Sequence, residues 1–173
     1  MDKALIYPHC RTAGADLNIR PSLLLAICQQ ESSFNESEMR LENGFYRKYT
    51  RPMRWASTTE ALFAVSYGLM QVMGQSLYED GFFRWHFEQK DDRYRAFYDN
   101  DEMHEIHVVK AINALMDNPE WQVRWGAIHL SGKLRKAKGE IPKALLYYNG
   151  GGNPHYDDEV LAKETQLMKG LEV

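Results

Sequence analysis

The residue best placed to do chemistry is Glu31, a carboxylate at the end of an apolar helix face. Pro21 suits the first position of a helix, and Leu24, Ile27, Cys28 and Glu31 then follow at the i, i+3, i+4 and i+7 spacing of one helical face. Burial on that face and the partial negative charge of a helix C-terminus both favour a protonated carboxyl and raise its pKa. Glu31 could therefore act as a general acid near neutral pH. On position alone, an ordinary polar residue at a helix end is the commoner explanation.

Three separated motifs favour a catalytic role for Glu31 over that of an ordinary helix-end residue. Residues 30–35 read QESSFN, residues 68–73 read GLMQVM, and residues 144–151 read ALLYYNGG. In this order they resemble the motifs of the soluble lytic transglycosylase (SLT) family, of which the first is Glu-Ser-x-aromatic-Asn and the third is usually Ala-Tyr-Asn-Ala-Gly. A weaker similarity lies at residues 118–130, so the resemblance spans residues 20–160 with gaps.

The resemblance implies a single lysozyme-like domain over residues 1–173, mainly α, with a substrate cleft and at most a small β-hairpin. It also implies cleavage of the β-1,4 bond from N-acetylmuramic acid to N-acetylglucosamine in peptidoglycan. Glu31 would first protonate the bridging oxygen and then, as a carboxylate, take the proton of the muramoyl C6 hydroxyl. That hydroxyl closes a 1,6-anhydro ring, so the reaction consumes no water. Peptidoglycan strands are the implied partner, and no cofactor is implied.

The resemblance also assigns roles to residues of the second and third motifs. Tyr148 matches the tyrosine whose hydroxyl reaches the catalytic carboxyl, and Asn149 matches the residue after it. Gln71 and Met73 match residues that line the sugar subsites. Physical reasons agree, because a phenol can donate to a carboxylate, an amide can satisfy an N-acetyl group and a thioether can mould to a sugar face. Ordinary roles stay open, with Met73 as core filler, Gln71 as a solvated turn residue and Tyr148 as a core residue with a surface hydroxyl.

Residues 36–65 depart from the family pattern, because simpler members have a shorter link between the first two motifs. This insertion leaves open whether Ser57 or Ser66 stands where the family places a polar residue near the catalytic acid. Ser66, next to the second motif, and Ser32, next to the catalytic acid, are our candidates for substrate binding. Gly150 replaces the usual alanine of the third motif, which loosens the turn without affecting the chemistry.

Two other functions fit part of this pattern. A goose-type lysozyme has a similar pairing of Glu with Gly-Leu-Met-Gln, but a hydrolytic enzyme needs a second carboxylate about 5–9.5 Å from the first. The acidic residues that could supply it are Glu36, Glu38, Glu42, Glu60 and Asp80. A non-catalytic glycan-binding or virion structural module could also keep the fold, although such a module has no use for a buried acid.

The remaining periodicity predicts the helices that must position these motifs. One amphipathic helix covers residues 108–115, and another runs from about residue 123 to a basic end at residues 133–138. Shorter helices are predicted at residues 141–148 and 156–167. The segment 66–74 fits neither period and is bracketed by glycines, so it predicts a turn or short hairpin leading into a helix near Gln75.

Composition excludes several classes of function. Lys and Arg number 21 against 24 Asp and Glu, and a net charge of -3 gives no basic field for nucleic acid or an anionic membrane. No segment approaches the roughly 20 apolar residues of a membrane span. Cys10 and Cys28 are expected to be buried thiols, although a disulfide is open; with only two cysteines and no clustered histidines, no metal site is expected. We expect a monomer.

The N-terminal sequence lacks the basic and then apolar run of a secretory signal. A cell-wall enzyme without a signal suggests a bacteriophage protein, either carried in the virion or released as an endolysin with help from a holin. A removed signal or a domain excised from a larger protein would give the same sequence. In each case the expected site of action is the periplasm or cell wall.

Overall fold

The computed structural model describes residues 1–53, 57–88 and 105–169, and these residues are mainly helical. The three strands are β1 (Met39–Leu41), β2 (Val65–Tyr67) and β3 (Val72–Met73). The helices are α1 (Lys3–Leu17), α2 (Pro21–Ser32), α3 (Asn43–Phe45), α4 (Ser57–Phe63), α5 (Gly74–Glu79), α6 (Phe82–Glu88), α8 (Glu105–Met116), α9 (Pro119–Lys136), α10 (Ile141–Tyr148) and α11 (Tyr156–Lys169), with a π-helical segment η1 (Tyr46–Thr50) and a 3-10 turn η2 (Arg51–Met53).

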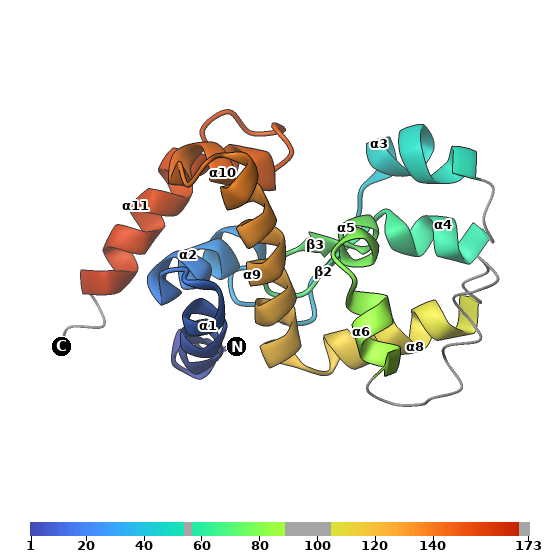
Figure 1. Cartoon of the computed structure of the whole chain (residues 1–173), viewed down its shortest axis with the longest axis horizontal. Coiled ribbons are helices and arrows are strands. Elements are labelled where there is room, and N and C mark those ends of the chain that lie inside the picture. Colours follow the sequence, from blue (N-terminus) through green and yellow to red (C-terminus); the bar gives the residue numbers. More distant parts are fainter. Residues whose placement is uncertain (54–56, 89–104, 170–173) are drawn as a thin grey trace.

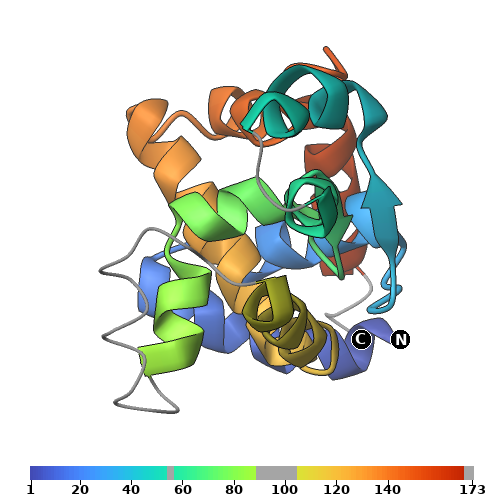
Figure 2. The same ribbon diagram turned by 90° about the vertical axis from the view of Figure 1, so that its right-hand side faces the viewer.

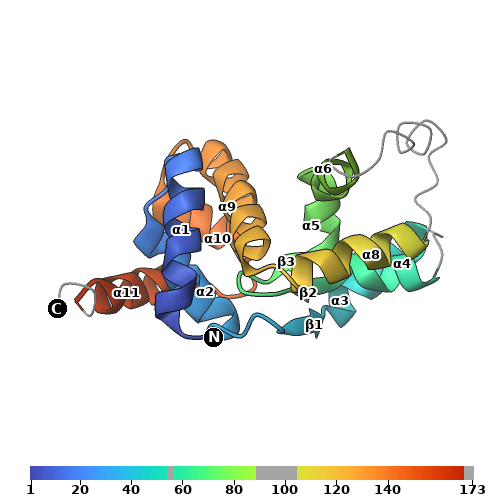
Figure 3. The same ribbon diagram turned by 90° about the horizontal axis from the view of Figure 1, so that it is seen from below.

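Helix α9 runs through the middle of the molecule, and the other helices lie on its two sides (Figure 1). On one side α9 packs against α1 and α10, and α11 packs along α2. On the other side lie α4, α5, α6 and α8, and the small sheet lies between the two groups (Figure 3). This arrangement makes neighbours of α2 and α11, which come from opposite ends of the chain.

The sheet confirms the hairpin expected at residues 66–74 and adds a strand to it. β2 and β3 pair antiparallel, with Ser66 opposite Met73. β1, from the insertion, pairs antiparallel with the other edge of β2, with Arg40 opposite Ser66. Figure 2 shows β1 at the periphery of the molecule. This third strand was not predicted, because three residues are too short a run to show a strand period and all three are exposed.

The turn between β2 and β3 is fixed by a buried glutamine of α9. Gly68 and Gln71 have positive φ values of 66° and 48°, and a Cβ on Gly68 would collide with Gln122. Gln122 accepts a hydrogen bond from the Leu69 N–H at 2.8 Å and donates to the Glu36 carbonyl at 3.1 Å. Its Nε2 also donates to carbonyls in the last turn of α8. Because a buried amide must be hydrogen-bonded, this side chain joins the turn, the insertion and α8 at one point.

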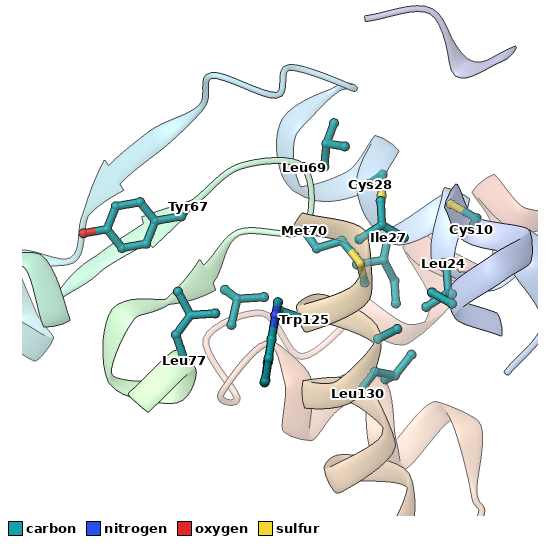
Figure 4. Close-up of a cluster of buried hydrophobic side chains, with 14 of the residues drawn as sticks. Cys10, Leu24, Ile27, Cys28, Tyr67, Leu69, Met70, Leu77, Trp125 and Leu130 are labelled. Atoms are coloured by element: carbon teal, nitrogen blue, oxygen red, sulfur yellow. The ribbon is translucent and has the colours of Figure 1, made fainter. Parts of the chain in front are cut away.

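The turn also contributes a side chain to the hydrophobic core. Met70 is fully buried and lies between α2 and Trp125 of α9 (Figure 4). Gly126 leaves space for it, since a Cβ there would overlap the Met70 side chain. The hairpin turn is therefore held by packing as well as by hydrogen bonds.

The structure confirms the helices predicted from periodicity as α2, α8, α9, α10 and α11, and the one expected near Gln75 as α5. It also confirms Cys10 and Cys28 as free, buried thiols. Helix α1 was not predicted, because Pro8 interrupts its pattern; the helix is nonetheless capped by Asp2. Within the described ranges, no helix combines the length and apolar character needed to cross a membrane.

Candidate active site

Helix α2 positions Glu31 at the edge of the core. Pro21 occupies the first turn, and the next seven residues, 22–28, are all buried. The helix ends at Ser32, and the next residue, Ser33, is left-handed with φ 51° and donates its N–H to the Gln29 carbonyl. Glu31 is half-buried where the helix leaves the core, as its place on an apolar face predicts.

The group that contacts Glu31 is Tyr156, in the first turn of α11. Its hydroxyl donates to Glu31 Oε1 at 2.5 Å, and its side chain is nearly fully buried. Further along α11, the buried Glu164 accepts hydrogen bonds from Arg20 and, at 2.6 Å, from Ser22 at the start of α2. These polar contacts, together with a hydrogen bond from Gln30 to Glu159, fix α11 along α2 and hold the phenol against the carboxyl.

The surroundings of Glu31 favour its protonated form. Burial raises the pKa of Glu31, as the sequence predicts. The hydrogen bond from Tyr156 and the charge of Arg40 lower this pKa without cancelling the effect of burial, and the charge of Glu42 raises it again. Burial first, and the charge of Glu31 second, raise the pKa of Tyr156 far above its ordinary value. Tyr156 is therefore a neutral hydrogen-bond donor at any physiological pH.

The predicted contact between Tyr148 and Glu31 is wrong. Tyr148 ends α10, and its hydroxyl donates to the Met70 carbonyl at 2.8 Å. Its ring packs edge-on against His129 of α9, with the ring centroids 5.4 Å apart. Because α10 packs on α9 beside the hairpin turn, the phenol of Tyr148 reaches the backbone of the turn. Glu31 is still close enough for its charge to add to the burial that raises the pKa of Tyr148.

Two further predicted site residues, Ser32 and Asn149, bond to backbone atoms. The Ser32 hydroxyl donates to the Leu69 carbonyl at 2.9 Å and to the Cys28 carbonyl at 3.0 Å. Asn149 Oδ1 accepts from the Asn153 N–H at 2.7 Å and so closes the glycine-rich turn between α10 and α11. Ser32 therefore ties α2 to the hairpin turn, and Asn149 sets the path of the chain into Tyr156.

The remaining predicted residues lie on the hairpin. Gln71 is buried, not solvated, and its Nε2 donates to the Gly68 carbonyl at 2.9 Å and the Glu38 carbonyl at 3.1 Å. Its Oε1 is buried and accepts no hydrogen bond from the described residues. Met73 is half-buried at the end of β3, and Ser66 is buried on β2 directly opposite it. The side chain of Ser57 lies outside the described residues.

The structure brings to the site two groups that sequence reasoning did not assign to it, Tyr156 and Arg40, and one, Glu42, that was named only among five candidates for a second carboxylate. Tyr156 was missed because it follows the third motif, although its spacing to Val160 and Leu167 marks one buried face of α11. Arg40 and Glu42, whose charges reach Glu31, lie in the insertion. Nothing in their local sequence indicates that β1 returns to the vicinity of Glu31.

No set of three or more His, Cys, Asp or Glu side chains among the described residues has the arrangement of metal ligands. Asp80 and His129 approach each other at 2.7 Å and form a partly buried pair beside Tyr148. With only two such groups, this pair supports the ring of Tyr148 and does not form a metal cage.

Comparison with known proteins adds one finding. The family model described as the transglycosylase SLT domain matches residues 9–95, half of the chain. The matched range contains Glu31, Gln71 and Met73, whereas α9, α10 and α11 lie beyond it. No curated protein and no solved structure matches the chain.

The raised pKa of Glu31 predicts how Glu31→Gln changes stability. The folded protein holds the Glu31 proton more tightly than the unfolded chain, so this contribution to stability is present at low pH and is lost as pH rises through the folded-state pKa. Glu31→Gln should therefore melt higher than wild type at about pH 7.5, and the two should converge at about pH 4. Thermal unfolding followed by circular dichroism gives the comparison. The matched control is Glu79→Gln at an exposed helix end, for which we expect no such pH-dependent gain; a lower melting temperature for Glu31→Gln at neutral pH would contradict the burial of this charge.

Proposed function

The chain belongs to the transglycosylase SLT domain family, whose members are enzymes that cleave peptidoglycan, and from this premise we propose that it breaks the glycan strand without water. The bond cleaved is the β-1,4 link from N-acetylmuramic acid to N-acetylglucosamine, and the product carries a 1,6-anhydromuramoyl end. The observation that carries the proposal is a half-buried carboxyl with a raised pKa that is held by one neutral donor, Tyr156. Such a group can hold a proton near neutral pH and can also exist briefly as an anion.

In the proposed reaction the Glu31 carboxyl acts first as a general acid and then as a general base. Glu31 gives its proton to the bridging oxygen, the bond from that oxygen to the muramoyl anomeric carbon breaks, and Glu31 becomes a carboxylate. The hydroxyl of Tyr156 stabilises this anion, because an anion buried without a donor is costly. The muramoyl C6 hydroxyl then bonds to the anomeric carbon and gives its proton to Glu31. Glu31 is therefore protonated again at the end of the reaction, and no water is consumed.

The other residues fall into two groups in this proposal. Met73, half-buried at the end of β3, contacts the sugar face, and Ser66 is its neighbour across the hairpin. Gln71, Ser32 and Tyr148 hold the turn that precedes Met73. Asn149 holds the turn that delivers Tyr156. Tyr148 is thus proposed as a positioning residue and not as the partner of the acid.

One observation favours hydrolysis as the alternative. Glu42 is a second carboxylate whose charge reaches Glu31, and a hydrolase needs such a group. Glu42 is, however, bound to Arg40 through a contact of 2.6 Å, which ties up one of its oxygens. The carboxylate that would have to activate water is thus already engaged with a cation, so the non-hydrolytic reaction is the better-supported choice.

Product mass separates the two reactions. Digests of purified peptidoglycan should contain muropeptides with 1,6-anhydromuramoyl ends, lighter by one water than lysozyme products, and Glu31→Gln should lower their release by about 10⁴-fold or more because one group acts in both steps. Mass spectrometry of the digests gives both results. Reducing muramoyl ends as the sole product would establish the hydrolytic alternative, and turnover by Glu31→Gln within about tenfold of wild type would remove Glu31 from the central role.

The two buried tyrosines give a matched pair of variants. Tyr156→Phe removes the donor to Glu31 and should lower kcat by about 10- to 150-fold, the value of one hydrogen bond to a charged group. Tyr148→Phe leaves the Met70 carbonyl without its donor and should cost about 1–3 kcal/mol of stability with a smaller loss of rate. Turnover and melting temperature are measured for both. A greater loss of rate in Tyr148→Phe than in Tyr156→Phe would reverse the assignment.

A further inference from the structure

Three residues form one row across the sheet. Arg40 lies opposite Ser66, and Ser66 lies opposite Met73. Residues directly opposite one another on antiparallel strands direct their side chains to the same face, so the three share a face. The adjacent row contains Tyr67 and Val72, both buried in the core. The row from Arg40 to Met73 therefore belongs to the face turned away from that part of the core.

Glu31 lies close to this row, because the hydroxyl of its neighbour Ser32 bonds to the Leu69 carbonyl in the turn between β2 and β3. Glu31 and Arg40 act on each other electrostatically, each favouring the charged form of the other. Arg40, on β1, is thus at one end of this row. Met73, at the other end, lies on β3 just before α5. The insertion supplies this arginine, and the position is open to solvent, since about 56% of the Arg40 side chain is exposed.

The guanidinium of Arg40 has unused hydrogen-bonding capacity. Its Nε donates to Glu42 at 2.6 Å. Among the described residues, no hydrogen bond is made by the other two guanidinium nitrogens, which carry four of its five N–H groups. A planar fork of this kind binds carboxylates through two parallel hydrogen bonds. Glu42 fixes the orientation of the fork, leaving one edge free.

We infer that Arg40 binds a carboxylate borne by the lactyl side chain of the muramoyl residue whose glycosidic oxygen Glu31 protonates, and so determines which glycan strands the enzyme prefers. The inference rests on the proposed function. The muramoyl sugar is the only one of the two peptidoglycan sugars that carries an acid. Its lactyl carboxyl is free on stripped strands, and on intact strands it is joined to a stem peptide that has carboxylates of its own. Both sources offer the same chemistry to the guanidinium.

The test compares KM for three soluble substrates. They are strands with stem peptides, strands stripped by an amidase, and stripped strands whose lactyl carboxyl has been converted to an amide. Arg40→Gln should raise KM about tenfold on at least one of the charged substrates and leave KM unchanged on the neutral one. An effect confined to stripped strands identifies the lactyl carboxylate, and an effect confined to intact strands identifies the stem peptide.

Glu42→Gln tests whether Arg40 binds substrate or only forms an ion pair with Glu42 that holds β1. It frees the Arg40 guanidinium and removes a competing negative charge, so it should lower KM by up to about fivefold on the charged substrate that Arg40 recognises. If the pair served only to hold β1, both variants would raise KM alike on all three substrates, and the inference would be overturned.

A surface arginine of similar exposure provides the control. Arg124 of α9 pairs with Asp16 of α1, and Arg124→Gln should leave KM unchanged. Equal KM for Arg40→Gln and Arg124→Gln would refute the inference, as would a change in the pH profile of kcat with no change in KM. Because KM is compared whatever the product, hydrolytic products would refute the proposed reaction while still deciding the role of Arg40.

Discussion

The hydrogen bonding of the tight turn between β2 and β3 is the constraint on which the rest of the structure depends. Residues 68–71 make one backbone hydrogen bond of their own, from the Gln71 N–H to the Gly68 carbonyl, and three helices supply side chains for other backbone groups of the turn. Gln122 of α9 accepts from Leu69, Ser32 of α2 donates to Leu69, and Tyr148 of α10 donates to Met70. Each bond satisfies a backbone group in a poorly hydrated place, where an unsatisfied group would cost about 1–3 kcal/mol. The turn therefore fixes the helices relative to the sheet.

This constraint explains the placement of the proposed acid at the end of α2. Ser32 anchors α2 to the turn, which places the neighbouring Glu31 beside the sheet at the edge of the core. α11, held along α2 by the buried Glu164, then brings Tyr156 to the carboxyl. The acid is thus desolvated by the fold and hydrogen-bonded by a segment more than a hundred residues away. Burial raises the affinity of the Glu31 carboxyl for its proton, and the hydrogen bond from the Tyr156 hydroxyl stabilises the carboxylate.

The sequence indicates the parts of this site that depend on local pattern. Glu31 lies on a periodic apolar face, and the glycine-bracketed segment 66–74 forms the predicted hairpin, since both signals come from neighbouring residues. The partner of the acid could not be found in this way. Tyr148 and Tyr156 each lie at the end of a buried helical face, and only the packing of α11 on α2 decides which phenol reaches Glu31. The position of Arg40 depends likewise on strand register, which three exposed residues do not reveal.

The central claim is that burial raises the pKa of Glu31 and that the hydrogen bond from Tyr156 offsets part of this rise. The most direct measurement is an NMR titration of the Glu31 side-chain carboxyl carbon in the wild-type protein and in Tyr156→Phe. The account predicts a titration midpoint above that of an ordinary glutamate in the wild type, and a still higher midpoint in Tyr156→Phe, because the lost hydrogen bond favours the carboxylate. A wild-type midpoint at or below the ordinary glutamate value, or a lower midpoint in Tyr156→Phe, would contradict it.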